Sequence, residues 1–482
     1  MLKRFLRCLP IVVCLTAASV QLPPETKAPL PAPPPPEHPA LESLPTQSEN
    51  PSPVRAATIP LPPSVVAPCD CCAKKPSYNS QKGWTPPYPW TAFTGQIAII
   101  TQRHNGDPDP PAPKDRVVMI WNLNAESLAQ PNAEWGTAST PATQYYSDPR
   151  WTYQNIGEVF GLTLDNLGNI YVASTAIYGT TASGFIYKIA NGSGTPTAFA
   201  SLPNNFNGLG NIAYDCGYNS FYVSNFYNGF IYRLSSSGSV VGTWDHGANL
   251  LTAVPSRTPI PTAAKDGSSS YTALGRRPWA VRVYKNHLYY SIWSQDGARH
   301  PGAGANEIWS VALAGNGNPM GSARLEITLP TLTSAGYSNP VSDISFTAMG
   351  TMLVAERTMQ GNNVSGAHVS RALEFSPSGS GWVPSPAHYL VGSINPGNPA
   401  NSAGGVDFDL TLGSPFPVWV SGDALHYQPN DYIYGIQGFP AAGGSITSSL
   451  LIDADDYTGQ SNKTQIGDVK IPCSGPVTPI PN

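Results

Sequence analysis

The sequence predicts an all-β fold, and more narrowly a six-bladed β-propeller, from its alternation, its repeats and its composition. Residues 156–189 hold three short segments in which apolar and polar residues alternate between glycine-bearing turns, a pattern typical of antiparallel strands. A second copy covers residues 210–234, and the third strand of both copies reads FIY followed by Lys or Arg. A repeat of about fifty to seventy residues with four strands indicates a propeller blade. No stretch shows a sustained 3.6-residue apolar period, so we expect very little helix.

The composition favours a turn-rich, exported protein. Only 12% of the 482 residues are charged, whereas Gly (45) and Pro (51) are abundant. The formal net charge is −4, and no basic patch with interleaved aromatic residues is present. Nucleic acid is therefore not expected as a partner.

Residues 1–20 read as a secretory signal peptide. Three basic residues precede a short apolar run at 9–15, and small residues follow at 16–19. The run is too short to cross a membrane. Cys14 raises lipidation as an alternative, although Val13 stands where a small residue is usual. The protein is thus expected to be secreted, periplasmic or attached to the cell surface.

The region before the propeller is predicted to have two parts. Residues 21–68 are so rich in proline that we expect a disordered, semi-rigid stalk capable of surface attachment; a ligand for a proline-binding domain is the alternative. Residues 69–94 contain a cysteine cluster and an aromatic, proline-rich lead-in. The propeller is then expected at 95–473, with a tail at 474–482.

Five cysteines remain after the leader, and in an oxidising compartment we expect them to be mostly disulfide-bonded. A soft-metal site is the alternative, but no further His or Cys pair follows at zinc-site spacing. The odd number leaves one thiol free or paired between molecules. These disulfide candidates are Cys69, Cys71, Cys72, Cys216 and Cys473.

The chain holds five units with alternating strands, counting the two repeats described above. Residues 250–275 form a long Ser/Thr/Pro-rich insertion, which is often a lid or a binding loop. The predicted units are 158–189, 210–244, 279–329, 342–392 and 405–454.

The two ends of the domain complete the sixth blade. Residues 466–473 resemble a first strand without followers, since they echo residues 156–159, whereas the strands in 95–123 lack a first strand. We therefore predict that Gly467–Ile471 pairs with Gln96–Thr101. This closure brings Cys473 near the residues that precede Gly95, and it predicts a disulfide to one of the three clustered cysteines.

The start of each inner strand lies at the mouth of the central channel. Aligning these strands places together Gly161, Asn211, Trp279, Asp343 and Gly405, with Asp468 one step earlier and Glu158 three residues before the position of its own strand. Carboxylate and amide oxygens suit Ca²⁺ or another divalent cation. The alternatives are polar residues that solvate the channel, or carboxylates neutralised by a nearby base such as Arg282.

The repeats at 156–189 and 210–234 resemble the NHL and SMP-30-type six-bladed propeller families, and the resemblance covers most of residues 94–473. SMP-30-like lactonases hold a divalent cation with a similar Glu/Asn/Asp set. The resemblance therefore implies a cation-dependent hydrolase with metal ligands Glu158, Asn211, Asp343 and Asp468, although the family's fuller motifs around Asn211 and Asp343 are missing.

The sequence lacks a nucleophile elbow, a P-loop, a zinc-protease motif and a haem-attachment motif. We therefore expect a non-catalytic binding or surface-interaction propeller. Its ligand, a protein, a glycan or a small molecule, would lie at the channel mouth or on a loop face. The alternatives are the cation-dependent hydrolase and a structural component of the cell envelope.

Overall fold

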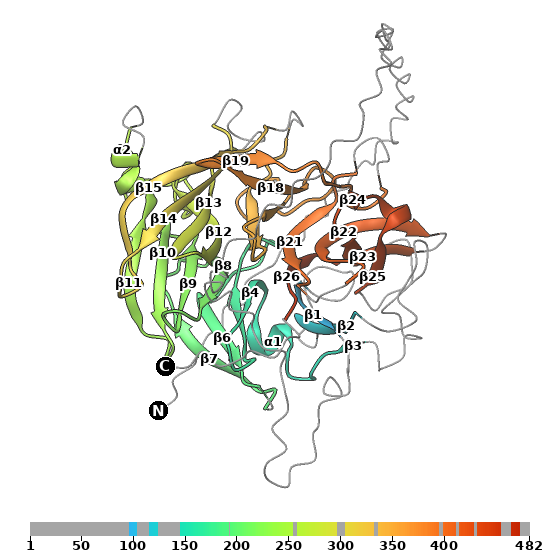
Figure 1. Cartoon of the computed structure of the whole chain (residues 1–482). Helices are drawn as coiled ribbons and strands as arrows, with labels where there is room; N and C mark the ends of the chain where they lie inside the picture. The colour runs from blue at the N-terminus through green and yellow to red at the C-terminus, as the bar shows by residue number, and fades with distance from the viewer. Residues whose placement is uncertain are drawn as a thin grey trace, which may run out of the picture. The chain divides into compact units, whose positions relative to one another are not determined.

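Six β-sheets follow one another around a ring in the computed structural model and form the six-bladed propeller that the sequence predicts (Figure 1). The structure describes residues 96–103, 115–123, 145–191, 193–253, 258–295, 304–331, 336–394, 399–410, 414–428, 431–454 and 464–472. The predicted signal peptide, stalk, lead-in and tail lie outside these residues, as do Cys69, Cys71, Cys72 and Cys473. Cys216 is the one cysteine described, so no pairing between two of the disulfide candidates lies within the described residues.

Blade 1 joins the two ends of the domain. Its inner strand β26 (Ile466–Lys470) pairs with β1 (Ile97–Gln102), which is followed by β2 (Val118–Asn122) and β3 (Tyr145–Tyr146). Ile100 lies opposite Val469 in an antiparallel register. The predicted closure is therefore confirmed. Each sheet of the ring therefore packs against a neighbouring sheet on both faces.

Blades 2, 3 and 4 are four-stranded meanders, each built from consecutive strands. Blade 2 consists of β4 (Val159–Leu164), β5 (Ile170–Ser174), β6 (Phe185–Ile189) and β7 (Pro196–Ser201). Blade 3 consists of β8 (Leu209–Asp215), β9 (Ser220–Asn225), β10 (Phe230–Ser235) and β11 (Val240–Asp245). Blade 4 consists of β12 (Arg277–Tyr284), β13 (His287–Trp293), β14 (Glu307–Leu313) and β15 (Pro319–Thr328).

Blades 5 and 6 are linked at their outer edges. Blade 6 consists of β21 (Ser402–Phe408), β22 (Val418–Gln428), β23 (Asp431–Phe439) and β25 (Leu450–Asp453). Blade 5 consists of β16 (Val341–Phe346), β17 (Met352–Glu356) and β18 (Ala372–Ser378), and β18 pairs with both β19 (Gly381–Pro384) and β20 (His388–Tyr389). The short β24 (Gly443–Gly444) leaves blade 6 and pairs with β20. Sequence reasoning placed one outer strand near 389–392, where the structure divides that role among three short strands.

Little helix is present in the described residues, as expected. It comprises α1 (Tyr153–Ile156), α2 (His246–Ala253) and the 3₁₀ turn η2 (Ile446–Ser448). Among these residues no helix combines the length and apolar character needed to cross a membrane.

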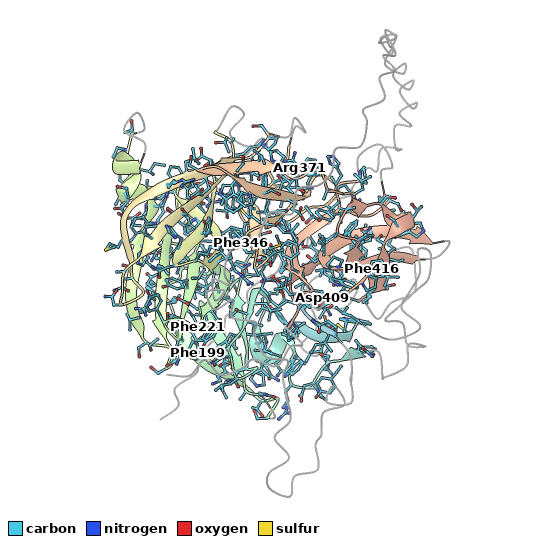
Figure 2. All side chains as sticks on the ribbon, viewed as in Figure 1. Phe199, Phe221, Phe346, Arg371, Asp409 and Phe416 are labelled. Carbon is cyan, nitrogen blue, oxygen red and sulfur yellow. The ribbon has the colours of Figure 1, made fainter. Side chains whose placement is uncertain are left out.

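The core is divided into layers between neighbouring blades. A separate cluster of buried apolar side chains fills each of the six blade–blade interfaces. Between blades 2 and 3, for example, the rings of Phe199 and Phe221 pack at 5.1 Å (Figure 2). Alternation along each strand sends successive side chains into the two interfaces that flank a blade. The period-two pattern in the sequence is therefore the direct cause of the layered core.

Candidate functional site

The inner strands are tied together by hydroxyl groups at a shared irregularity. In all six blades the register between the inner and second strands shifts near the start of the inner strand. In four blades a hydroxyl group of the second strand accepts a hydrogen bond, at 2.8–2.9 Å, from an N–H of its own inner strand that the register shift leaves unpaired. The same hydroxyl donates a hydrogen bond, at 2.5–2.7 Å, to a carbonyl of the inner strand of the next blade. These hydroxyls belong to Thr101, Ser224, Ser291 and Ser421.

Polar and small residues alternate around the axis at this level. The odd-numbered blades contribute an acid or an amide, and the even-numbered blades a residue with little or no side chain, in the order Asp468, Gly161, Asn211, Ala280, Asp343 and Gly405. A Cβ on Gly161 would lie 2.7 Å from the Cα of Asn211, and one on Gly405 would lie 2.7 Å from the Cα of Asp468. The small residues therefore let the inner strands approach closely and confine the polar side chains.

One position of the sequence alignment requires correction. The alignment placed Trp279 among the axial residues, but Ala280 occupies that position in blade 4. The N–H of Ala280 donates to Ser291, just as the N–H of Asn211 donates to Ser224. The sequence alignment used the first apolar position of each inner strand, and in blade 4 that position, Trp279, lies one residue before Ala280.

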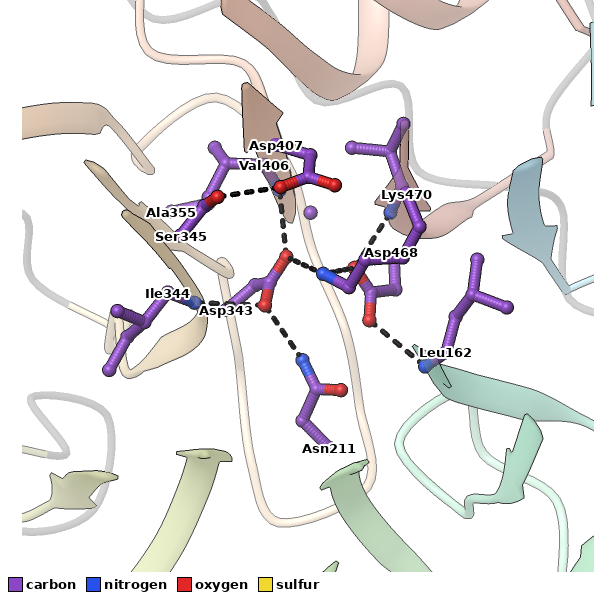
Figure 3. Close-up of polar contacts among 12 residues, drawn as sticks. Leu162, Asn211, Asp343, Ile344, Ser345, Ala355, Val406, Asp407, Asp468 and Lys470 are labelled. Atoms are coloured by element: carbon purple, nitrogen blue, oxygen red, sulfur yellow. Dashed lines mark hydrogen bonds and ion pairs between the residues drawn. The ribbon is translucent and has the colours of Figure 1, made fainter. Parts of the chain in front are cut away.

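Two of the predicted carboxylates meet at the axis, and a lysine lies between them (Figure 3). The ammonium group of Lys470 lies 2.8 Å from Asp343 and 3.0 Å from Asp468. Asn211 donates to Asp343 at 3.1 Å. We call Asp343, Asp468 and Lys470 the axial triad.

The oxygens of Asp343 are fully occupied. One accepts from Asn211 and from the N–H of Ile344, and the other accepts from Lys470 and from the N–H of Val406 in the next blade. A carboxylate offers about four acceptor directions, and all four are in use.

Asp468 is bonded in a similar way. It accepts from Lys470 and from the N–H groups of Val469 and Leu162, the latter in blade 2. Each acid therefore joins its own blade to the next one.

Burial and mutual repulsion shape the electrostatics of the triad. Burial, followed by the charge of Asp343, raises the pKa of Asp468 well above its usual range, although Lys470 opposes the shift. Burial would lower the pKa of Lys470, but the charges of Asp343, Asp468 and Asp407 outweigh it and raise that pKa. Lys470 is therefore a permanent cation at the axis at neutral pH.

Glu158 belongs to a different cluster. Its carboxylate contacts Arg103 at 3.3 Å and accepts a hydrogen bond from Thr180. Burial raises its pKa, whereas Thr180 and Arg103 lower it. The four predicted ligands are therefore divided, with Asn211, Asp343 and Asp468 together and Glu158 apart from them.

The fit to a divalent cation is poor on the geometry shown. Among the described residues no group of three or more His, Cys, Asp or Glu side chains is arranged to hold a metal ion. The positive charge that faces the two acids comes from Lys470, a residue that sequence reasoning did not select. Its signal was present, because residues 468 and 470 lie two apart on one strand and so face the same side.

Aromatic side chains cover the axis next to this polar level. Trp279 contacts Phe160, Phe226 and Trp293 with ring centroids 5.2–5.7 Å apart. Tyr271, from the insertion predicted as a lid or binding loop, joins the same buried cluster. Asn211, Asp343 and Asp468 are at most 1% exposed. In the described part of the chain these three side chains are therefore closed to solvent.

An open groove lies instead on the outside of the ring, between blades 4 and 5. Its volume is about 420 Å³, and strands β13, β14 and β15 line one side while β18 and β19 line the other. Its floor and walls include Tyr289, Arg324, Glu326 and Trp382. Sequence reasoning did not select any of these residues, because the groove arises from the short hairpin of β18 and β19, which no repeat predicts.

Comparison with known proteins finds only solved structures of distant likeness. No family model matches the chain, and no curated protein matches it. A solved structure described as a nidogen/laminin complex is 10% identical, covering 79% of this chain and 99% of that one, with a TM-score of 0.38. A protein from Lactobacillus plantarum is 11% identical, covering 78% and 99%, with a TM-score of 0.39.

A gluconolactonase from Xanthomonas campestris is also similar, with 11% identity, coverage of 64% of this chain and 95% of that one, and a TM-score of 0.32. Likeness at this level does not carry an activity or a ligand over to this chain. The family resemblance drawn from the sequence is confirmed only for the six-bladed fold.

Proposed function

We propose that this chain is an exported, non-catalytic binding propeller that uses its axis for stability and binds its ligand on the outer surface of the ring. The observation that carries the proposal is the contact of Lys470 with both axial carboxylates. An internal ammonium group takes the place that a catalytic cation would need. The acids beside it are already bonded to the backbone of neighbouring blades.

Export is supported by the sequence. A basic n-region, a short apolar run and small residues precede the proline-rich stretch, and the low charge fits an extracellular setting. The stretch at 21–68 would hold the propeller away from a surface, as a semi-rigid spacer.

The test compares metal dependence with binding. The purified protein is melted with calcium chloride and with EDTA, assayed for hydrolysis of gluconolactone and other lactones, and applied to a glycan array with EDTA present. We expect equal melting temperatures, no metal-dependent hydrolysis, and array binding that survives EDTA. Hydrolysis that requires Ca²⁺ and is lost in Asp343→Asn would overturn the proposal in favour of the cation-dependent hydrolase. An array without binding would leave the structural envelope role as the better account.

A further inference from the structure

The groove between blades 4 and 5 holds an aromatic side chain in a fixed orientation. The indole N–H of Trp382 donates to Glu326 at 2.9 Å, and Arg324 contacts the same carboxylate at 3.1 Å. Tyr289 and Phe346 pack around the indole with ring centroids 6.3 and 6.0 Å away. Trp382 nevertheless stays half-buried rather than enclosed. A rigid aromatic face of this kind binds with little loss of side-chain entropy.

Polar groups around this ring have hydrogen-bonding capacity to spare. The Tyr289 hydroxyl and the Ser322 hydroxyl line the groove without a hydrogen bond to any described residue. His287 uses Nδ1 on the carbonyl of Lys285, which leaves Nε2 available in the groove. These groups include both donors and acceptors.

The charges of the groove are nearly balanced. Arg324 is exposed, and the carboxylate of Glu326, only 4% exposed, is occupied by Arg324, Trp382 and Ser310. A strongly anionic ligand would need more cations than the groove offers. A ligand with alternating apolar and hydroxyl-bearing faces matches the groove better, because it satisfies the ring and the spare groups together.

A pyranose ring has those faces, since its axial C–H groups form an apolar side and its hydroxyls both donate and accept. The groove volume of about 420 Å³ lies at the lower end of the range of about 300–1,000 Å³ that is usual for small-ligand sites. Its open shape leaves room for a chain to continue beyond the bound units.

We propose that this groove is a saccharide-binding site in which one sugar ring stacks on Trp382 and its hydroxyls bond to Tyr289, His287 and Arg324. The proposal rests on the proposed binding function and deepens it by naming the ligand class and the site.

The experiment measures binding of cellobiose, maltose, diacetylchitobiose and digalacturonate to the purified protein by calorimetry and by tryptophan fluorescence. We expect at least one of the three neutral disaccharides to bind, digalacturonate to bind more weakly because the groove offers few cations, and Trp382→Ala to weaken the binding of the neutral disaccharide at least tenfold. Arg324→Gln and Tyr289→Phe, which retain the packing of the groove, should each weaken it about threefold to tenfold.

Val383→Ala is the matched control. Val383 is exposed and neighbours Trp382 on β19, so its side chain points to the other face of the strand and should leave binding unchanged. Binding that all the groove variants leave intact would overturn the groove as the site while the binding function stands. Failure of all four disaccharides to bind would overturn the saccharide class as the ligand. Binding of a ligand that is not a saccharide would still support the proposed binding function.

Discussion

The axis of the ring and the groove between blades 4 and 5 both combine charged and aromatic residues, but they differ in what those residues leave unused. At the axis, both carboxylate oxygens of Asp343 already accept hydrogen bonds from groups of the protein itself. In the groove, the Tyr289 hydroxyl lines the wall without a hydrogen bond to any described residue. A concentration of charge is therefore a poor sign of function by itself. Donors and acceptors on an accessible surface that form no hydrogen bond within the protein are a better sign of a binding site.

The largest effect is expected from removing the cation of the axial triad. Lys470→Met leaves two buried carboxylates facing each other, and breaking a buried pair in this way costs about 3–5 kcal/mol of the free energy of unfolding. Denaturant unfolding at neutral pH measures the loss. Lys470→Met with Asp468→Asn should recover part of it, because one of the two charges is then gone.

The same variant has a predicted pH dependence. The folded-state pKa of Asp468 is already raised, and it rises further without Lys470, so the folded state binds a proton more tightly than the unfolded state. Lys470→Met should therefore gain stability relative to the wild type as the pH falls from neutral toward about 4, the ordinary pKa of an aspartate in the unfolded chain. A constant difference over this range would mean that the two acids are not confined together.

A smaller effect is expected from crowding the axis. A Cβ on Gly405 would lie 2.6–2.7 Å from backbone atoms of Gly467, Asp468 and Val469, which cannot move aside as a side chain can. Gly405→Ala should cost about 1–3 kcal/mol through overpacking. Gly315→Ala is the control, since nothing lies within 4 Å of its added Cβ. Equal melting temperatures for the two variants would show that the inner strands are not packed as closely as the structure indicates.

The hydroxyl bridges between blades should contribute less. Ser291→Ala removes the donor to the carbonyl of Val341 and the acceptor for the N–H of Ala280, both of which are buried. The expected loss is about 1–2 kcal/mol of the free energy of unfolding. Ser237→Ala, in an exposed turn, should change stability by less than about 0.5 kcal/mol. A loss of the same size in both variants would count against the bridge.

The sequence was informative about the ring and less so about its chemistry. Strand alternation and the orphan segment Ile466–Lys470 predicted the closure, because both follow from local patterns that the chain repeats. The same alignment brought Asn211, Asp343 and Asp468 together. It did not select Lys470, because it compared one position in each inner strand and Lys470 lies two residues beyond that position. The separate position of Glu158 likewise depends on Arg103, which no repeat predicts.

The groove could not be predicted for a related reason. Trp382 lies in a four-residue strand, and its environment comes from β15 of the preceding blade, more than fifty residues earlier in the sequence. Patterns of period two identify blades but say nothing about which residues meet at their outer edges. The cysteine predictions, in contrast, stay predictions, since four of the five candidates lie outside the described residues.

The smallest effect on stability is expected from Tyr289→Phe, and it distinguishes the two regions most sharply. Burial, followed by the charge of Glu326, raises the pKa of Tyr289 to about 12. In the unfolded chain this phenol ionises near pH 10. The stability that follows from the raised pKa is therefore fully present below about pH 10 and is lost as the pH rises toward 12. At neutral pH the free energy of unfolding of the variant should therefore lie within about 0.5 kcal/mol of that of the wild type, because the lost hydroxyl has no hydrogen-bond partner in the described part of the chain.

The difference between wild-type and variant ultraviolet titrations should show one phenol ionising near pH 12. A saccharide that covers Tyr289 should move this ionisation to still higher pH, whereas a ligand bound elsewhere would leave it in place.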